Sequence, residues 1–189
     1  MRHWLFNKSV AGVDESGRGP LAGPVVGAAV VFAPSSAVFV PKDSKALTPK
    51  QREMYFEKIN QSVISIGIGI ADSNVIERIN ILQASLAAMA EAVQKLNAPP
   101  DIVLVDGNKA LPIDIEQNCI VKGDLKCSSI AAASVVAKVT RDRMMYEYDE
   151  KYPMYGFRQH KGYPTKQHLE AIRKYGPCPI HRKTFKGVY

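Results

Sequence analysis

Two apolar runs separated by a glycine-rich loop open the patterned part of the chain. Val10–Asp14 is the first run, and the second, Val25–Phe32, is rich in valine. Branched side chains of this kind favour extended backbone. The intervening loop holds Gly17, Gly19 and Gly23, which relax steric limits on the backbone. The pattern predicts two strands that the loop can join as a hairpin.

Helical periodicity follows further along. Thr48 before Pro49 is typical of a helix start, and the helix is expected to run to about Asn60, with Met54, Phe56 and Ile59 facing inward. The remaining helices are expected as follows: a short one starting at Asp72, an amphipathic one over Asn80–Leu96, a long one from Cys127 to about Lys151, and a last one over Thr165–Tyr175. The amphipathic helix carries Leu82, Leu86, Met89 and Val93 at helical spacing.

Three further strands are expected between these helices. Ser62–Ile70 alternates isoleucine with serine and glycine, and Asn118–Lys122 is a short fifth strand. Ile102–Val105 is continuously apolar, as in a strand buried on both faces. A hairpin followed by alternating strands and helices predicts an α/β fold with a mixed sheet.

Composition limits the class of protein. The chain has 189 residues, 46% of them hydrophobic and 23% charged, which suits one soluble domain over residues 1–189. No apolar run is long enough for a membrane span, and residues 1–8 lack a signal-peptide stretch. Cys119, Cys127 and Cys178 show no Cys-x-x-Cys spacing. We therefore expect a cytoplasmic protein without a zinc site or disulfide framework.

Positive charge is concentrated late in the chain. The formal net charge is +7, and residues 151–189 hold nine Lys and Arg against one acid, Glu170. This portion, from about residue 150 to residue 189, is expected to bind polynucleotide phosphates. The alternative is a solubilising tail. Aromatic residues are interleaved with the charges, which favours binding: Tyr152, Tyr155, Phe157, Tyr163 and Tyr175.

The glycine loop has several alternative interpretations. A polar turn is the simplest. A dinucleotide site requires Gly-x-Gly-x-x-Gly opening a helix, whereas Gly17, Gly19 and Gly23 are followed by a strand-like run. A P-loop is excluded as well, because no Gly-Lys-Ser/Thr triplet follows.

Four acids stand where strands end or a glycine interrupts the chain: Asp14, Glu15, Asp106 and Asp124. Asp106 before Gly107 could be a β-turn, and Asp124 could cap the helix that follows. Asp14 and Glu15 can share a site only if their strand bends or ends there, because neighbouring strand residues point to opposite faces. Together the acids indicate a carboxylate cluster of the kind that binds Mg²⁺ or Mn²⁺.

At this point the chain resembles the ribonuclease HII family, the bacterial type 2 ribonuclease H. Asp14-Glu15-Ser16-Gly17-Arg18-Gly19 is similar to that family's D-E-x-G-R-G signature. The further matching segments are residues 42–47, 104–107, 129–142, 160–165 and 181–185, where Thr184 replaces the usual serine. The resemblance implies a ribonuclease H-like fold, a five-stranded mixed sheet flanked by helices, with a helical basic C-terminal part. It also implies that Asp14, Glu15, Asp106 and Asp124 are the catalytic acids and metal ligands.

The resemblance implies a metal-dependent endonuclease that hydrolyses the RNA strand of RNA–DNA hybrids and nicks duplex DNA 5′ to single ribonucleotides. Two ions, Mn²⁺ or Mg²⁺, would activate a water and stabilise the leaving oxygen, leaving a 3′-hydroxyl and a 5′-phosphate. Gly17, Arg18, Gly19 and Tyr163 would read the junction at the ribonucleotide. Lysines and an arginine are candidate phosphate contacts or solvated charges: Lys42, Lys45, Lys138, Arg141 and Lys161. His160 and His181 are expected to make phosphate or structural contacts. A monomer serving ribonucleotide and primer removal is expected.

We weigh three rival interpretations and reject the first. A type 3 ribonuclease H has the same fold with an extra N-terminal domain and a different acid pattern; nine residues precede the first strand here, which favours type 2. A catalytically silent module would bind hybrids without metal-dependent cleavage. A polynucleotide scaffold would depend on the basic portion after about residue 150 and not on the acids.

Overall fold

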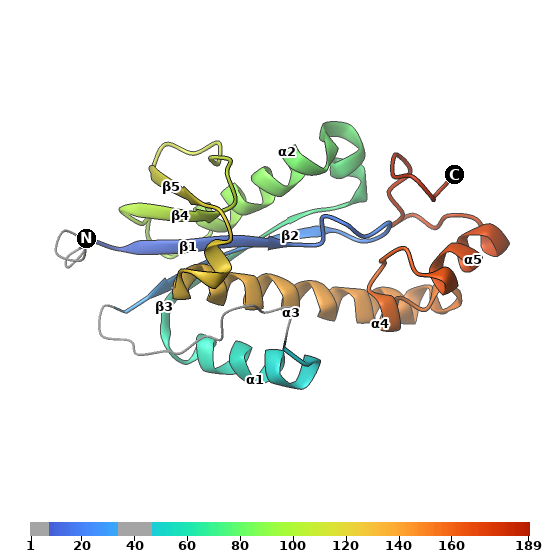
Figure 1. Ribbon diagram of the computed structural model, residues 1–189, viewed down its shortest axis with the longest axis horizontal. Helices are drawn as coiled ribbons and strands as arrows, with labels where there is room; N and C mark the ends of the chain where they lie inside the picture. The colour runs from blue at the N-terminus through green and yellow to red at the C-terminus, as the bar shows by residue number, and fades with distance from the viewer. Residues whose placement is uncertain (1–7, 34–46) are drawn as a thin grey trace.

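A five-stranded mixed sheet forms the centre of the protein (Figure 1). The computed structural model describes residues 8–33 and 47–189, so Lys42 and Lys45 lie outside the described residues. The strands are β1 Val10–Ser16, β2 Val25–Phe32, β3 Val63–Ala71, β4 Ile102–Asp106 and β5 Glu116–Ile120. The helices are α1 Pro49–Asn60, α2 Ser73–Gln94, α3 Ser128–Lys151, α4 Phe157–His160 and α5 Lys166–Tyr175, with 3-10 turns η2 Gly123–Leu125 and η3 Pro153–Tyr155.

The strand order is β3-β2-β1-β4-β5, which places β1 in the middle of the sheet. β1 and β2 pair antiparallel across the glycine loop, and β2 pairs antiparallel with β3. β1 and β4 are parallel, as are β4 and β5. The predicted hairpin and mixed sheet are therefore confirmed. Because β1 and β4 run in the same direction, their carboxyl ends meet at one edge of the sheet.

Helices cover both faces of the sheet. α2 lies on one face, against β2 and β3, and α3 lies on the other, against β1 and β2, with α1 packed on α3 (Figure 1). Glycines allow this close approach. A Cβ atom at Gly12 would lie 2.2 Å from the carbonyl carbon of Ser129 in α3, and one at Gly27 would lie 2.6 Å from Ala88 in α2.

α1 begins as the sequence predicts. Thr48 and Gln51 form a capping box, in which each side chain accepts a hydrogen bond from the other residue's backbone amide. Ile59 is buried, but the inward position expected for Met54 is wrong, since this side chain is 43% exposed. Tyr55 packs against the core in its place.

The predicted break between two helices at Asn80 is confirmed. α2 is interrupted there, where Asn80 has φ 65° and ψ 165°. Its Oδ1 accepts hydrogen bonds from the amides of Leu82 and Gln83, at 3.0 and 3.1 Å. The asparagine side chain therefore caps the second helical segment.

The fifth strand begins two residues earlier than predicted, at Glu116 and not at Asn118. The predicted range included Val121, which lies beyond the end of β5 and is 57% exposed. β5 is an edge strand with little buried surface, so hydrophobicity marks its position weakly.

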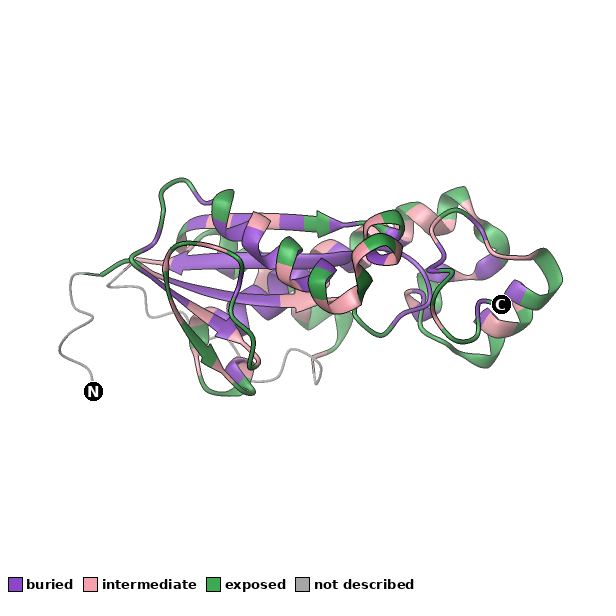
Figure 2. Cartoon of the chain, turned by 90° about the horizontal axis from the view of Figure 1, so that it is seen from above, coloured by how far each residue is buried: buried purple, intermediate pink, exposed green. Residues whose placement is uncertain are grey.

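The C-terminal portion packs around the far end of α3, beyond the sheet (Figures 1 and 2). Its core includes Phe157 and Ile172, which are buried together with Met145 of α3 and with Leu21 and Ala22 of the glycine loop. This packing holds the basic portion against the loop that connects β1 and β2. In the part of the chain that the structure describes, no helix is long and apolar enough to span a membrane.

Candidate active site

Asp14 and Glu15 lie near the end of β1, which continues to Ser16. Asp14 is only 6% exposed, and its Oδ1 accepts a hydrogen bond of 2.7 Å from the Glu15 amide. The Ser134 hydroxyl of α3 also hydrogen-bonds to Asp14. The Glu15 carboxylate forms an ion pair with Arg18, with 3.3 Å between Oε1 and Nη1. The helix α3 therefore orients the Asp14 carboxylate, and the glycine loop orients the Glu15 carboxylate.

Asp106 ends β4 beside them. Val13 of β1 pairs with Val105 of β4, so the next residue of each strand is an acid. The Gly123 amide donates a hydrogen bond of 2.6 Å to Asp106 Oδ1, which ties η2 to the end of β4. Asp124 follows on η2 and is half-buried; its Oδ1 accepts a hydrogen bond of 3.1 Å from the Leu125 amide.

Three of the four acids interact electrostatically. Burial raises the pKa of Asp14 well above its usual value, and repulsion from Glu15 and Asp106 raises it further. Burial raises the pKa of Glu15 as well, an effect that Arg18 opposes and Asp106 reinforces. The fold therefore concentrates negative charge where water is scarce, which is costly unless a cation compensates it.

The chemistry of these side chains suits a hard divalent cation, but the side chains do not lie close enough together to bind one in this arrangement. Carboxylate oxygens are the ligands that Mg²⁺ and Mn²⁺ prefer, and a cation would relieve the repulsion among Asp14, Glu15 and Asp106. Within residues 8–33 and 47–189, no group of three or more His, Cys, Asp or Glu side chains is close enough together to hold a metal ion. The four-acid metal site stays a prediction.

A cleft of about 500 Å³ opens beside the acids. It is lined by Glu15, Ser16, Gly17, Arg18, Gly19, Asp106, Ser134, Lys138 and Tyr163. Gly17 has φ 104°, a conformation that favours glycine. The Tyr163 ring faces the loop, with its Cε1 3.5 Å from the position that a Cβ of Gly19 would take. The cleft thus joins acids, bare backbone, one aromatic ring and one lysine.

Comparisons with known proteins show the family of this chain. The sequence model of the family Ribonuclease HII matches residues 11–188. The chain belongs to the ribonuclease HII family. It is therefore a ribonuclease H, an endonuclease of the hydrolase class.

Relatives match across almost the whole chain. Ribonuclease HII of Geobacter metallireducens is 56% identical over 180 residues, covering 95% of this chain and 84% of the relative. Ribonuclease HII of Bacillus subtilis is 54% identical over 179 residues, covering 95% and 70%.

Solved structures confirm the ribonuclease H-like fold. Ribonuclease H2 from Pyrococcus horikoshii has a TM-score of 0.79 at 30% identity, and the match covers 95% of each chain. Bst-RNase HIII in complex with Mn²⁺ has a TM-score of 0.74 at 18% identity, covering 98% of this chain and 70% of that one. The second likeness concerns the fold alone.

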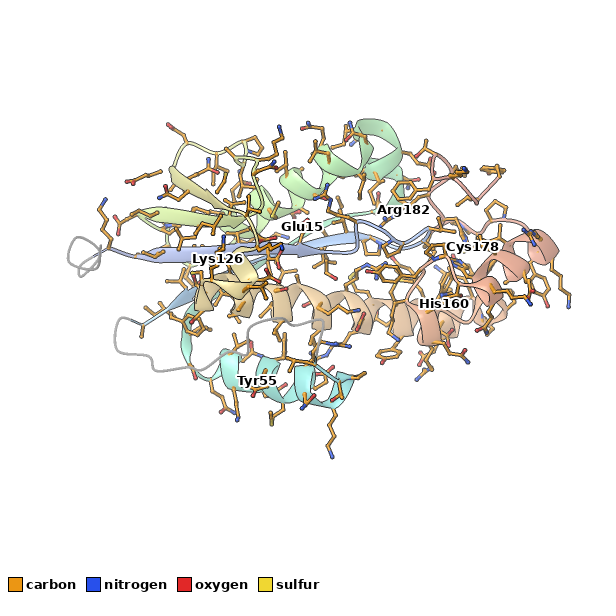
Figure 3. All side chains as sticks on the ribbon, in the orientation of Figure 1. Glu15, Tyr55, Lys126, His160, Cys178 and Arg182 are labelled. Carbon is orange, nitrogen blue, oxygen red and sulfur yellow. The ribbon has the colours of Figure 1, made fainter. Side chains whose placement is uncertain are left out.

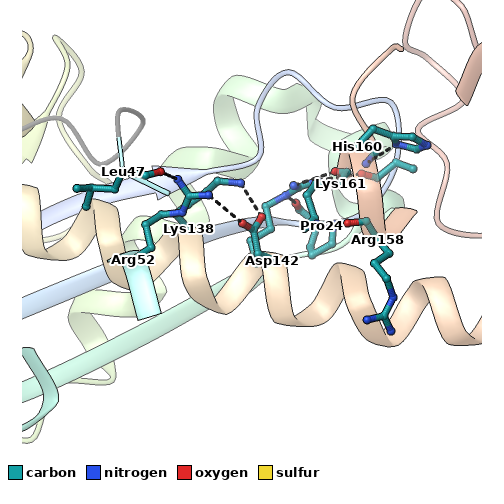
Figure 4. Close-up of polar contacts among 11 residues, drawn as sticks. Pro24, Leu47, Arg52, Lys138, Asp142, Arg158, His160 and Lys161 are labelled. Atoms are coloured by element: carbon teal, nitrogen blue, oxygen red, sulfur yellow. Dashed lines mark hydrogen bonds and ion pairs between the residues drawn. The ribbon is translucent and has the colours of Figure 1, made fainter. Parts of the chain in front are cut away.

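In this ribonuclease HII, the basic residues predicted to contact phosphates do not all lie in the cleft. Lys138 lines the cleft, and its Nζ lies 2.6 Å from Asp142 Oδ1 (Figure 4). Lys161 is not among the cleft-lining residues; its ammonium donates to the Arg158 carbonyl and lies 4.3 Å from the Tyr146 ring centroid. Arg141 is fully buried, so its interpretation as a phosphate contact is wrong.

Sequence reasoning left two alternatives for the histidines and missed the tasks of two further residues. His160 and His181 are buried and belong to the structural alternative, not to phosphate binding. Ser134 looked like one small residue in a run that packs on the sheet, and Arg182 looked like one more basic residue in a basic portion. Only the motif segments 129–142 and 181–185 of the ribonuclease HII family drew attention to them.

Proposed function

We propose that this ribonuclease HII hydrolyses the RNA strand of RNA–DNA hybrids and nicks duplex DNA 5′ to single embedded ribonucleotides. The products carry a 3′-hydroxyl and a 5′-phosphate. The observation that supports this most is the single cleft in which Glu15 and Asp106 face the glycine loop and Tyr163. The same cleft therefore contains carboxylates that could bind a metal ion and backbone and aromatic groups that could contact a sugar of the substrate.

The acids have distinct supports. Asp14 is oriented by the Ser134 hydroxyl and the Glu15 amide, Glu15 by Arg18, and Asp106 by the Gly123 amide. Asp124 completes the proposed ligand set from η2. When bound there, Mg²⁺ or Mn²⁺ would supply activation of the attacking water and charge stabilisation at the leaving oxygen. Bst-RNase HIII, which shares the fold, is a protein solved in complex with Mn²⁺.

Substrate recognition is assigned to the other side of the cleft. Gly17, Arg18 and Gly19 would meet the ribonucleotide, whose 2′-hydroxyl distinguishes RNA from DNA. Tyr163, which is 44% exposed, offers a ring face for the sugar that follows. Lys138 and the basic C-terminal portion would contact phosphates. We propose a cytoplasmic monomer that removes misincorporated ribonucleotides and RNA primers.

The test is cleavage of a labelled DNA duplex that carries one ribonucleotide, with Mg²⁺, with Mn²⁺ and with EDTA. Wild type, Asp106→Asn and Asp114→Asn are compared, because Asp114 is an exposed acid on the connection between β4 and β5. We expect metal-dependent nicking 5′ to the ribonucleotide by wild type and Asp114→Asn. Asp106→Asn should lose at least about 10²-fold in rate, since removal of one strong charge contact in a catalytic site has effects of that order.

The alternative outcomes are distinct. Tight binding to the duplex without nicking in either metal would indicate a silent hybrid-binding module. Nicking that survives Asp106→Asn would place the metal site on other acids. Loss of function only on removal of the basic C-terminal portion would favour the scaffold interpretation.

A further inference from the structure

Two fully buried arginines, Arg141 of α3 and Arg182, lie beneath the glycine loop. Figure 3 shows Arg182 beside the connection between β1 and β2. Burial lowers the pKa of Arg182 to about 9 and that of Arg141 to about 10. In the part of the chain that the structure describes, neither forms an ion pair with a carboxylate. A buried charge is expensive unless other groups satisfy it.

Carbonyl groups satisfy both guanidiniums. Arg182 donates four hydrogen bonds to the loop, to the carbonyls of Gly17 at 2.6 Å, Pro20 at 2.8 Å, Gly23 at 3.0 Å and Arg18 at 3.1 Å. The planar guanidinium can serve several acceptors at fixed angles, which an ammonium cannot. Arg182 therefore determines the direction in which the loop's carbonyls point.

The direction of the carbonyls fixes that of the amides. The described residues contain no cis peptide bond, and in a trans peptide the carbonyl of one residue and the amide of the next point in opposite directions. Since the carbonyls of Gly17 and Arg18 point toward Arg182, the amides of Arg18 and Gly19 point away from it. Within residues 8–33 and 47–189 neither amide has a protein acceptor. Successive free amides of this kind form a concavity for an anionic oxygen.

Arg141 joins this loop to the tyrosine on the other side of the cleft. Its Nε and Nη2 donate to the carbonyls of Pro24 and Ala22, at 2.9 and 3.0 Å, and its Nη1 donates to the carbonyl of Lys161 at 3.0 Å. The Leu21 amide donates to the Gly162 carbonyl at 2.8 Å. Tyr163 follows directly, so the two sides of the cleft are attached to one buried frame.

We propose that Arg182 and Arg141 are positioning residues of this ribonuclease. They turn the loop's carbonyls inward, present the amides of Arg18 and Gly19 to oxygens of the substrate, and hold the loop at a fixed distance from Tyr163. The proposal rests on the proposed function, because the substrate is taken to be a ribonucleotide-containing duplex. It adds that selectivity for the ribonucleotide depends on two side chains that never touch it.

The experiment compares wild type, Arg182→Lys and Arg141→Lys, with the exposed Arg78→Lys of α2 as the matched control. Three quantities are measured well below each variant's Tm: kcat, KM, and the ratio of Kd values for all-DNA and one-ribonucleotide duplexes in EDTA. For Arg182→Lys we expect KM to rise about tenfold with kcat changed less than about threefold, because lysine keeps the charge but loses the fork. The Kd ratio should fall by about tenfold as well.

Each outcome decides between roles. A lowered Tm with unchanged KM and Kd ratio in both variants would show a merely structural role and overturn the proposal. Absence of cleavage by wild type would contradict the proposed function alone, while the Kd ratio in EDTA still tests the arginines.

Chemical rescue separates geometry from folding. In Arg182→Ala, added methylguanidinium should restore the Kd ratio toward the wild-type value, whereas methylammonium should not. Equal effects of the two cations, or none from either in a folded variant, would contradict positioning by the guanidinium fork. If Arg182→Lys does not fold, Arg141→Lys and the rescue experiment still decide.

Discussion

At the scale of single residues, a chain of buried side chains ends at the backbone of the cleft tyrosine. The His168 Nδ1–H donates to the Tyr163 carbonyl at 2.9 Å, which leaves His168 Nε2 as an acceptor for His181 Nε2–H at 3.0 Å. His181 Nδ1 then accepts from the Cys178 amide at 2.9 Å. All three contacts are satisfied only when both rings are neutral.

Acidification should weaken this series of hydrogen bonds. Burial lowers the pKa values of His168 and His181 to about 4, from the ordinary 6.5. Between these values the unfolded state binds more protons than the folded state, so stability is fully present above pH 6.5 and is lost as the pH falls toward 4. We expect about 3 kcal/mol to be lost from the free energy of unfolding for one such histidine, measured by thermal melts across this range.

A variant that lacks these histidine hydrogen bonds provides the comparison. His168→Gln with His181→Asn should be less stable than wild type near neutral pH and should lose less stability on acidification. If the wild type and the variant showed the same dependence of Tm on pH between 6.5 and 4, the histidines would not be the titrating groups.

At the scale of elements, α3 can approach the sheet closely because Gly12 of β1 has no side chain. Gly12 of β1 faces the first turn of α3, and Ser134 in the following turn contacts Asp14. Because a methyl group at Gly12 would overlap the Ser129 backbone at 2.2 Å, helix and strand cannot keep their present spacing with any larger residue. The same close packing brings Ser134 within reach of the acid.

Gly12→Ala should therefore cost both stability and activity. We expect a loss of about 3 kcal/mol in the free energy of unfolding, the upper range for overpacking a rigid core, and reduced cleavage even where the variant is folded. Gly19→Ala is the matched control for stability, since its Cβ would meet only the Tyr163 ring at 3.5 Å. Urea titrations of both variants measure the difference, and similar midpoints would refute this account of the packing.

Elements were predictable where local chemistry decides them. Thr48 with Pro49, and Asn80 within α2, mark helix starts through hydrogen bonds to neighbours in sequence. β5 was misplaced because its position depends on pairing with β4, a long-range contact that its own residues barely encode. Met54 was misassigned for a similar reason, because a short helix that packs on α3 buries only part of its surface.

At the scale of the whole molecule, charge is divided between two regions. Asp14, Glu15 and Asp106 lie near the ends of β1 and β4, whereas residues 151–189 carry a net charge of +8. Not all of that charge reaches the surface, since Arg182 is buried. The exposed remainder includes Arg173 and Lys174 on α5.

Neutralising surface charge in this portion should weaken binding without changing selectivity. Arg173→Gln with Lys174→Gln should lower affinity for all-DNA and ribonucleotide-containing duplexes alike, and should reduce the slope of log K against log salt by about 0.9 for each phosphate that the variant no longer neutralises. Arg78→Gln with Lys95→Gln on the α2 side is the control. Titrations at several salt concentrations measure this, and weaker binding of only one duplex would contradict the assignment.

Sequence therefore predicted the architecture, and the places of three acids near strand ends, more completely than the frame around them. Asp14, Glu15 and Asp106 are recognisable because acids at strand ends and a glycine loop are local signals. The tasks of Arg141 and Arg182 were hidden, since a buried arginine that serves carbonyls looks in sequence like any surface arginine. Lys161 shows the converse, because its residue type suggested a phosphate contact while its ammonium faces Tyr146.

The contact between Arg182 and Gly17 also has a consequence for biosynthesis. The two residues are separated by 165 positions in the chain, so a ribosome releases the glycine loop long before the guanidinium that organises it. Until then the loop carbonyls that Arg182 serves lack this partner, and β1 and β2 can pair while the cleft beside them is still unformed. Because chains generally begin folding from the N-terminal side, nuclease activity should arise in one late step, when residue 182 has left the ribosome.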